Sequence, residues 1–174
     1  MQTFSEQYGP WALVTGASTG IGEEFAYQLA ERGMHVILVA CDESNLTNVA
    51  NTIREKYGVE TKVVVCDLSK DDFLDKITTA TAACDVGLLV NNAGFALTGN
   101  FLDHTIEDEL SLLQVNCQVP IVLTHVFVQK MLVRRKGGII NVASAAAFLP
   151  LPQWTNYAAS KSYMLSFTEG LWYE

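Results

Sequence analysis

Positive charge is scarce in this sequence, and its scarcity excludes one class of function. Eleven Lys and Arg residues stand against nineteen Asp and Glu, which gives a formal net charge of −8 over 174 residues. The longest basic run, Arg134 to Lys136, precedes two glycines and is typical of a helix C-terminus, where the dipole favours cations. Binding a nucleic-acid backbone requires clustered positive charge, so we expect no nucleic-acid partner.

Cysteine and histidine are too few and too scattered to build a metal centre. No two cysteines form a C-x-x-C pair, and the three histidines lack zinc-type spacing. The four cysteines are Cys41, Cys66, Cys84 and Cys117. They are typical of reduced, mostly buried thiols, and the N-terminus lacks the basic and apolar regions of a signal peptide. We therefore expect a cytoplasmic protein without a metal site.

Long uninterrupted apolar runs are absent as well. No segment approaches a membrane span, so we expect no membrane partner. Hydrophobic residues make up 49% of the chain and charged residues 17%. That balance suits a single globular domain over residues 1–174 with a sizeable core.

Short runs rich in Val, Ile and Leu alternate with amphipathic stretches along the chain. Five runs are predicted strands: Trp11 to Gly16, His35 to Ala40, Thr61 to Cys66, Val86 to Asn91 and Gly138 to Ser144. Their near-continuous hydrophobicity is typical of strands buried on both faces of a parallel sheet. The helical patterns between them predict right-handed crossovers. The expected fold class is α/β: a Rossmann-like, doubly wound parallel sheet with helices on both faces.

One predicted helix contains a proline. The segment from Glu107 to Lys136 has a helical pattern throughout, despite Pro120. Proline removes a backbone N–H and clashes with the carbonyl four residues earlier, so we expect a bend near Asn116. The main-chain carbonyl of Asn116 would then be free for another partner.

The first predicted strand leads directly into TGASTGIG, Thr15 to Gly22, which opens a helix. We expect Gly16 to permit the tight turn, Gly20 to let the backbone approach a diphosphate, and Gly22 to let the helix pack closely. The helix N-terminus offers N–H groups and a positive dipole end to phosphate oxygens. No Lys-Ser or Lys-Thr follows the last glycine, which disfavours a P-loop.

Further motifs follow the predicted strands in order. They are Asp67 in CDLS, NNAG at Asn91 to Gly94, Asn116 in QVN, Ser144, and the Y-x-x-x-K pair Tyr157 and Lys161. Together with the glycine turn, this set resembles the classical branch of the short-chain dehydrogenase/reductase family, from Val14 to Glu174. Members of that family normally continue beyond this point. The resemblance therefore implies a domain that is incomplete at its C-terminus and lacks the family's last strands.

The resemblance implies a catalytic tetrad of Asn116, Ser144, Tyr157 and Lys161. Ser144 would orient the substrate oxygen, and the Tyr157 hydroxyl would exchange a proton with it while hydride passes between the substrate carbon and nicotinamide. The Lys161 ammonium would favour the phenolate form of Tyr157 and hold the nicotinamide ribose. The Asn116 carbonyl would hold a water that links Lys161 to solvent. The implied activity is NAD(P)-dependent interconversion of a small-molecule carbonyl and a secondary alcohol.

The resemblance also implies a cofactor-binding set. The set is Gly16, Ser18, Thr19, Gly20, Ile21, Cys41, Asp42, Asp67, Leu68, Asn92, Ala93, Gly94, Tyr157 and Lys161. Asp67 would accept a hydrogen bond from the adenine amino group; its alternative role is an N-cap of the next helix, to which Ser69 is equally suited. Asn91 would line the cofactor and tie neighbouring strands together. Thr15 would make a further contact with the turn or the phosphates.

The choice of nucleotide depends on the end of the second predicted strand. LVACDES places Cys41 and Asp42 beside the adenosine ribose. A carboxylate there binds the 2′-OH of NAD, whereas a nearby Arg accommodates the 2′-phosphate of NADP. Relatives with an LVAR pattern have Arg in place of Cys41, and Asp42 lies one position beyond the usual acid. The surrounding sequence resembles the NADP-using branch of the family, which favours NADP(H) as the cofactor. NAD(H) stays open as the alternative.

Apolar residues also cluster in the loops around the expected nicotinamide site. They are Phe95, Leu97, Phe148, Leu149, Leu151 and Trp154. Such a cluster indicates either a pocket for a lipid-like, steroid-like or aromatic carbonyl, or ordinary core packing.

Three interpretations of the chain compete. It is part of a longer dehydrogenase/reductase, a truncated and weakly active or inactive dinucleotide-binding protein, or another Rossmann-like enzyme such as a methyltransferase. The last leaves the Ser–Tyr–Lys set without a use, and we adopt the first. Because related enzymes pair through their long helices, we expect a homodimer or homotetramer.

Overall fold

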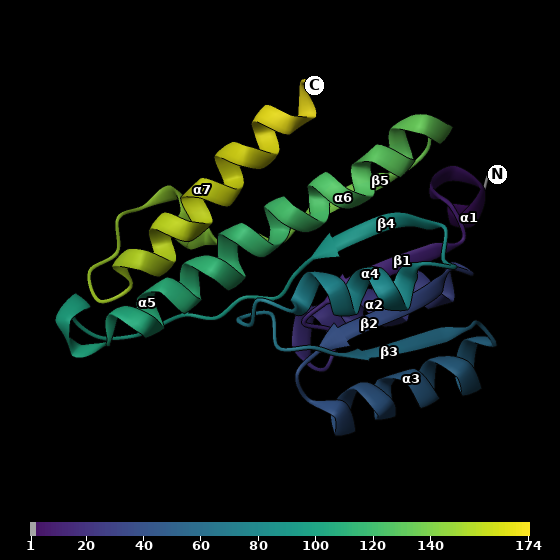
Figure 1. Cartoon of the computed structure of the whole chain (residues 1–174), viewed down its shortest axis with the longest axis horizontal. Coiled ribbons are helices and arrows are strands. Elements are labelled where there is room, and N and C mark those ends of the chain that lie inside the picture. The colour runs from purple at the N-terminus through teal and green to yellow at the C-terminus, as the bar shows by residue number, and fades with distance from the viewer. Residues whose placement is uncertain (1–2) are drawn as a thin grey trace.

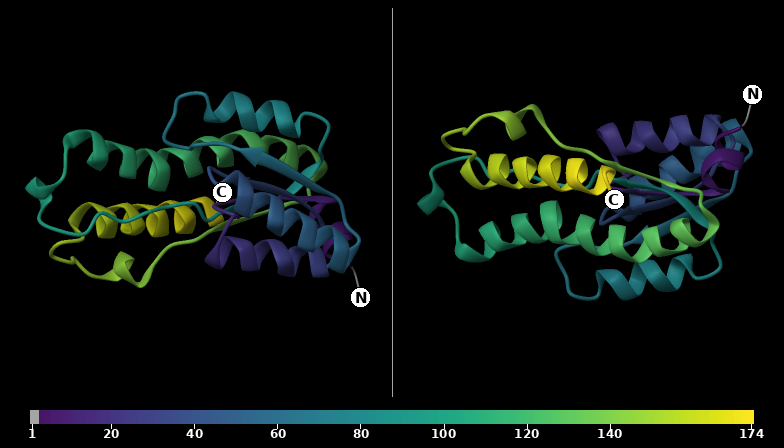
Figure 2. Two further views of the ribbon diagram at one scale, coloured as in Figure 1. Left: turned by 90° about the horizontal axis from the view of Figure 1, so that it is seen from below. Right: turned by 90° about the horizontal axis from the view of Figure 1, so that it is seen from above.

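A five-stranded parallel sheet forms the centre of the computed structural model, which describes residues 3–174 (Figures 1 and 2). The strands lie in the order β3-β2-β1-β4-β5. Their bounds are β1 (Trp11–Thr15), β2 (His35–Ala40), β3 (Thr61–Val65), β4 (Val86–Asn91) and β5 (Gly138–Asn141). The order reverses between β1 and β4, so the predicted doubly wound fold is confirmed and its switch point lies between these two strands.

Helices cover both faces of this sheet (Figure 2). The helices are α1 (Phe4–Tyr8), α2 (Gly20–Glu31), α3 (Glu43–Tyr57), α4 (Phe73–Thr81), α5 (Ile106–Leu113), α6 (Val119–Arg134) and α7 (Thr155–Trp172). Successive strand residues point to opposite faces: Leu13 packs in the cluster with α4 and α6, whereas Val14 packs in the cluster with α2 and α3. Burial on both faces explains the continuous hydrophobicity of the central strands.

The two edge strands are less buried than the sequence predicts. Val63 and Val65 of β3 are 37% and 42% exposed, because β3 is an edge of the described sheet, whereas Val64 between them is 6% exposed and packs in the cluster with α4. All four residues of β5 are half-buried, since β5 is the other edge of the described sheet. The prediction that every strand is buried on both faces is therefore wrong for β3 and β5.

The predicted irregularity near Asn116 is present in an unusual form. A π-helical segment, η2 (Gln114–Gln118), joins α5 to α6, and the Val119 N–H donates to the Gln114 carbonyl five residues earlier. Pro120 lies in the first turn of α6, where its missing N–H is tolerated. Inserted π-turns occur frequently at functional sites, and this one presents the Asn116 side chain to neighbouring elements.

The continuous helical stretch from Ile106 to Arg134 corrects one expectation. By length and composition alone it could cross a membrane, with a mean hydropathy of 1.4 over its most apolar window. Acidic residues near its start and Pro120 interrupt this run, so the sequence shows no unbroken apolar segment there. Within the fold 44% of that window is buried, and a core helix passes the same test. The run is therefore weak evidence for a membrane span.

Asn91 connects β4 to its neighbours. Its Nδ2 donates to Asn141 Oδ1 on β5 at 2.8 Å and to Thr124 Oγ1 on α6 at 3.3 Å. Asn141 Nδ2 in turn donates to Thr168 Oγ1 on α7 at 2.9 Å. The predicted role of Asn91 in tying neighbouring strands is confirmed, and the same chain of amides places α7 over the end of the sheet.

Candidate active site

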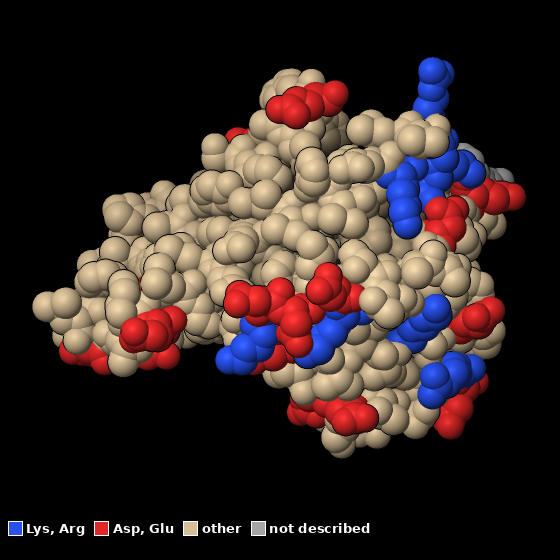
Figure 3. Space-filling model, viewed as in Figure 1, with Lys and Arg blue, Asp and Glu red and all other residues tan. Residues whose placement is uncertain are grey.

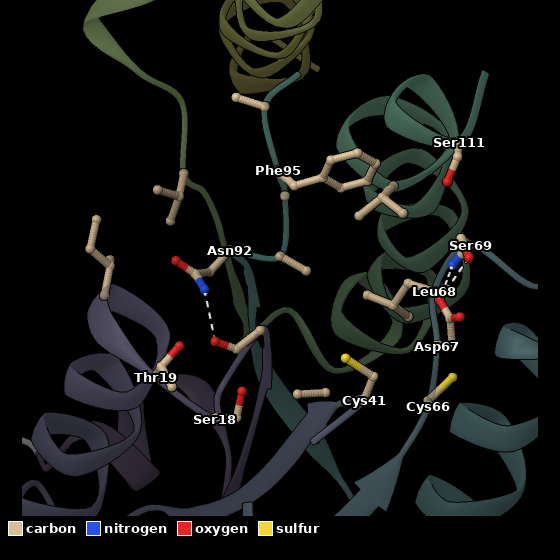
Figure 4. A pocket seen from close by; sticks show the side chains of 18 of the residues that line it. Ser18, Thr19, Cys41, Cys66, Asp67, Leu68, Ser69, Asn92, Phe95 and Ser111 are labelled. Atoms are coloured by element: carbon tan, nitrogen blue, oxygen red, sulfur yellow. Dashed lines mark hydrogen bonds between the residues drawn. The ribbon is translucent and has the colours of Figure 1, made fainter. Parts of the chain in front are cut away.

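A cavity of about 630 Å³ lies at the carboxyl ends of the strands, beside the switch point between β1 and β4 (Figure 4). Its size is typical of ligand pockets. Of the predicted site residues, those that line it are Gly16, Ser18, Thr19, Ile21, Cys41, Asp67, Leu68, Asn92, Ala93, Gly94, Tyr157 and Lys161. Residues from the glycine turn, the ends of β2 and β3, the NNAG loop and α7 thus meet in one place. Gly20, Asp42, Asn91, Asn116 and Ser144 are not among the lining residues.

The glycine turn packs too tightly for any larger residue at two positions. Gly16 has φ +65°, and a Cβ there would lie 2.8 Å from Asn92 Nδ2. A Cβ on Gly22 would overlap the Gly16 carbonyl, so the first turn of α2 can contact the turn closely only because Gly22 has no side chain. The predicted roles of Gly16 and Gly22 in a tight turn and close packing are confirmed. Gly20 has φ +60°, but its Cα faces open space and does not line the cavity.

Two polar side chains hold the glycine turn against the end of β4. Asn92 Nδ2 donates to the carbonyls of Thr15 and Gly16, at 3.0 and 3.2 Å, and Figure 4 shows its amide pointing at the turn. Thr15 Oγ1 accepts from the N–H groups of Asn92 and Ala93, both at 3.0 Å. Thr15 is only 1% exposed, so it serves the turn and not a phosphate. Sequence reasoning placed Asn92 at the cofactor and missed this clamp.

The start of α2 faces the cavity without a side-chain cap. Thr19 is the N-cap residue, yet its side chain makes no capping hydrogen bond. Ile21, in the first turn, is 62% exposed and lines the cavity. The N-terminal N–H groups and the positive end of the helix dipole therefore face the cavity, as the sequence predicts.

Asp42 does not reach the cavity, which corrects its assignment as a cofactor-binding residue. It is the N-cap of α3: Oδ1 accepts from the Asn45 N–H and Oδ2 from Asn45 Nδ2, both at 2.9 Å. Both carboxylate oxygens are therefore occupied by the first turn of α3. Cys41, one position earlier, is exposed and lines the cavity.

Asp67 lines the cavity and does not cap a helix. Its Oδ1 accepts from the Ser69 hydroxyl at 2.7 Å and from the Ser69 N–H at 2.9 Å. Both bonds lower the pKa of the Asp67 carboxyl, and the bond from the Ser69 hydroxyl has the larger effect. The next helix, α4, has Asp72 as its N-cap, so the alternative capping role of Asp67 and Ser69 is wrong.

Tyr157 and Lys161 lie one turn apart on α7 and line the same end of the cavity. Lys161 is only 6% exposed, and its Nζ lies 5.8 Å from the centroid of the Tyr157 ring. Nζ also donates to the Val142 carbonyl, just beyond β5, at 2.9 Å. Burial lowers the pKa of the Lys161 ammonium, because the charged form loses its hydration. The predicted proximity of the two side chains is confirmed.

The Asn116 side chain makes contacts that the sequence did not predict, while the expected contact of its main-chain carbonyl with a water stays a prediction. Asn116 is 1% exposed; its Oδ1 accepts from the Phe95 N–H and its Nδ2 donates to the Phe95 carbonyl, both at 3.0 Å. Nδ2 also donates to Ser160 Oγ on α7 at 3.0 Å. Through Asn116, the π-helical segment η2 thus connects the loop after β4 to α7, next to Lys161. A buried amide must find partners, but the sequence could not say which.

Ser144 lies at the edge of the site. It is half-buried and caps the short 3₁₀ helix η3 (Ala145–Phe148), where its Oγ accepts from the Ala146 N–H at 3.2 Å. This bond leaves the hydroxyl hydrogen free to donate. Ser144 is not among the residues that line the cavity, so its predicted contact with a substrate stays a prediction.

Four of the six apolar loop residues are not ordinary core packing. Phe148 and Leu149 are 72% and 62% exposed, and Trp154 is 38% exposed with its ring edge-to-face on Tyr157, 5.5 Å between centroids. Phe95 lines the cavity itself. The core alternative is therefore wrong for these residues.

The family model for short chain dehydrogenases matches residues 10–174. The chain belongs to this family. It is 38% identical over 170 residues to the very-long-chain 3-oxoacyl-CoA reductase of Mus musculus, which covers 94% of this chain and 54% of that protein. It is 37% identical over 172 residues to the hydroxysteroid dehydrogenase-like protein 1 of Gallus gallus, across 97% of this chain and 52% of that protein. The chain thus spans about half the length of the curated relatives it matches.

Solved structures of the family superimpose closely. A 7β-hydroxysteroid dehydrogenase studied for its stereoselectivity matches with a TM-score of 0.94 at 32% identity, over 97% of this chain and 65% of that one. A short-chain dehydrogenase from Sphingobium yanoikuyae in complex with NADPH matches with a TM-score of 0.88 at 31% identity, over 93% of this chain and 64% of that one. The cavity of this family member therefore lies in a fold shared with an NADPH complex.

We predict that Lys161→Met raises the stability of the folded protein. Methionine fills a similar volume without the desolvation cost of a buried ammonium, so the Tm should rise by about 2–4 °C for each kcal/mol relieved. Burial lowers the pKa of Lys161 in the folded chain, so the unfolded chain binds the proton more tightly. The cost is therefore complete below the lowered pKa and shrinks as the pH rises from the lowered pKa toward the ordinary value, about 10.4.

Thermal unfolding of both proteins between pH 7 and pH 10 measures this difference. Lys130→Met, on an exposed face of α6, is the matched control and should change the Tm little at any pH. A Tm for Lys161→Met below that of wild type, with a difference that does not change with pH, would contradict the prediction.

Proposed function

We propose that this chain forms the cofactor-binding and catalytic part of an NAD(P)-dependent oxidoreductase, which interconverts a carbonyl and a secondary alcohol. One observation carries the proposal: Tyr157 and a buried Lys161 line the cavity at the switch point, 5.8 Å between Nζ and the ring centroid. The match to the short chain dehydrogenase family over residues 10–174 supports it.

The residues present fit a dinucleotide. The tight approach at Gly16 and the uncapped start of α2 suit a diphosphate, whose oxygens accept hydrogen bonds from backbone N–H groups. Both bonds from Ser69 fall on Asp67 Oδ1, so Oδ2 is the atom suited to accept from an adenine amino group. Lys161, at the other end of the cavity, would hold the ribose next to the nicotinamide.

The proposed chemistry divides the work among three side chains. The nicotinamide, when bound, accepts or supplies the hydride at the substrate carbon. The Tyr157 hydroxyl gives a proton to the carbonyl oxygen during reduction and takes one back during oxidation. The Lys161 ammonium favours the phenolate that remains, since an opposite charge stabilises the ionised form. The Ser144 hydroxyl has its hydrogen free to donate to the same substrate oxygen.

A second candidate is a dinucleotide-binding protein with weak or no turnover. The observation that favours it is that Ser144 does not line the cavity. The two candidates share the cofactor site, so only turnover separates them.

For the substrate, we propose a bulky, apolar carbonyl compound. Phe148, Leu149 and Trp154 present exposed apolar side chains in the loops before α7, beside Tyr157. Two matched proteins carry names of the same kind, a very-long-chain 3-oxoacyl-CoA reductase and a 7β-hydroxysteroid dehydrogenase.

Tyr157→Phe should reduce turnover at least about 10²- to 10⁴-fold, because general acid–base catalysis contributes a factor of that size. Binding of the reduced cofactor should change little. Turnover is measured by loss of nicotinamide absorbance in a screen of apolar ketones, and binding by fluorescence titration. Tyr163→Phe is the control, since Tyr163 is 46% exposed on the same helix and stacks on Phe167 outside the cavity. Near-normal turnover by Tyr157→Phe would exclude the proposed acid–base role.

For the cofactor, we propose NADP(H) with weak discrimination against NAD(H). Asp42 caps α3 through both carboxylate oxygens and does not line the cavity, so we do not assign it a contact with the 2′ position. Cys41 lines the part of the cavity where we place the adenosine ribose, and it has no positive charge. Lys161 is the one cation among the lining residues of the described chain. The NADPH complexes of the Sphingobium yanoikuyae enzyme and of the L-sorbose reductase from Gluconobacter frateurii support NADP(H).

Cys41→Arg should shift the ratio of NADPH to NADH affinity by about 10-fold or more toward NADPH, since a hydrogen bond to a charged group contributes about 1.5–3 kcal/mol. Cys41→Ser keeps the site neutral and should leave the ratio unchanged. Fluorescence titration with each reduced cofactor measures the ratio. An unchanged ratio in the arginine variant would show that the 2′-phosphate lies elsewhere.

We also propose that the protein self-associates through α5. Ile106, Leu110 and Leu113 form an exposed apolar stripe along this helix, 60%, 57% and 37% exposed, at the spacing of one helical face. Figure 3 shows a broad surface with few charges over α6 and α7, with acidic residues gathered at the end near the start of α5 and basic residues near the end of α6. An exposed stripe of this kind favours burial against a second copy.

Leu110→Glu should lower the association state, because it places a charge in the middle of the stripe. Sedimentation velocity at several protein concentrations measures the state. Leu102→Glu is the control: Leu102 is 90% exposed in the 3₁₀ helix η1 (Phe101–Asp103), away from the stripe. A wild-type protein that sediments as a monomer would contradict the proposal.

A further inference from the structure

A buried carboxylate lies against the first turn of the helix that carries Tyr157. Glu109 of α5 is only 6% exposed. Glutamate is almost never so deeply buried unless its carboxylate is paired. Its partner is Asn156, whose Nδ2 donates to Glu109 Oε2 at 2.6 Å and to the Glu109 main-chain carbonyl at 3.0 Å. One amide therefore fastens both the side chain and the backbone of α5 to α7.

The start of α7 has no side-chain cap of its own. Trp154 is the N-cap residue, and its side chain makes no capping hydrogen bond. A carboxylate close to the first turn of a helix is favourable, since that end of the dipole is positive. Glu109, reaching across from α5, supplies the negative charge that the sequence of α7 does not.

Further contacts join the same two regions. The Gly99 N–H donates to the Gln153 carbonyl at 3.0 Å, which ties the loop after β4 to the loop before α7. His104, Glu109, Gln153 and Asn156 all line one small cavity between these loops, about 10 Å³ in volume. The Glu109–Asn156 hydrogen bonds are thus the central polar contact between α5 and the start of α7.

Tyr157 is the residue after Asn156, whereas Lys161 is fixed separately. Lys161 Nζ is held by the Val142 carbonyl at 2.9 Å, and the neighbouring Ser160 Oγ by Asn116 at 3.0 Å. A change at Asn156 would therefore move Tyr157 relative to Lys161 and leave Lys161 in place. We propose that Glu109 is a positioning residue, which acts through Asn156 to set the place of the Tyr157 hydroxyl. This inference rests on the proposed function, because it concerns the geometry of the proposed acid–base group.

The test compares Glu109→Ala, Glu109→Gln and Asn156→Ala with wild type. Glu109→Ala should lower kcat about 10- to 100-fold, the size of effect expected when a reacting group is displaced by about 1 Å. The dissociation constant of the reduced cofactor should stay within about twofold, because the glycine turn and Lys161 are untouched. Glu109→Gln retains an acceptor oxygen and should recover much of the loss. Asn156→Ala should match Glu109→Ala, and the double variant should be no worse than either.

Glu107→Gln is the matched control, since Glu107 is exposed on the same helix and the charge change is identical. Hydrogen exchange provides a readout without a substrate: Glu109→Ala should speed exchange at the amides of residues 158–161, which bond to the first turn of α7, and Glu107→Gln should not. Full kcat and unchanged exchange in Glu109→Ala would overturn the inference, as would a fall in Tm with kcat unaffected. Tyr157→Phe run in parallel separates the two proposals. If that variant keeps its turnover, the proposed function fails; if it is inactive while Glu109→Ala is fully active, only the positioning role fails.

Discussion

The clamp between the ends of β1 and β4 is the contact on which the site depends. At the switch point the helices after these strands leave on opposite faces, and the space between them must stay open for a ligand. Thr15 and Asn92 hold the two strand ends together through hydrogen bonds of 3.0 to 3.3 Å. The side chain of each residue bonds to the backbone at the end of the other strand. The turn that follows β1 can then approach the NNAG loop closely, because Gly16 lacks a side chain.

A second set of contacts fixes α7 over the cavity. Asn116 bonds Ser160, Asn141 bonds Thr168, and Lys161 bonds the Val142 carbonyl. These three contacts join α7 to the π-helical segment η2, to β5 and to the segment after β5, respectively. Buried polar groups of this kind are satisfied by one geometry only, so they specify the helix position as well as stabilise it. The burial that positions Lys161 also lowers the pKa of its ammonium, so the same contact links structure to chemistry.

The sequence predicted the fold well because its signals are local and periodic. Apolar runs located all five strands to within about three residues, and the order of motifs located the turn, the NNAG loop and α7. It was less reliable for residues whose role depends on a partner distant in the chain. Asp42 looked like a ribose ligand but caps α3, since Asn45 lies three residues on. The side-chain bonds of Asn116 to Phe95 and Ser160 were likewise not predicted, because both partners lie far from it in the chain.

What the sequence determined by itself is the set of elements and the kind of chemistry they support. Alternating apolar runs require a buried parallel sheet, three glycines require a close turn, and a Tyr and a Lys four residues apart lie on one face of a helix. Only the tertiary structure decided which polar atoms meet. The burial of Lys161, the capping of α3 by Asp42 and the contact between Glu109 and Asn156 depend on distances between elements. Those distances follow from packing the whole core, because no local pattern specifies them.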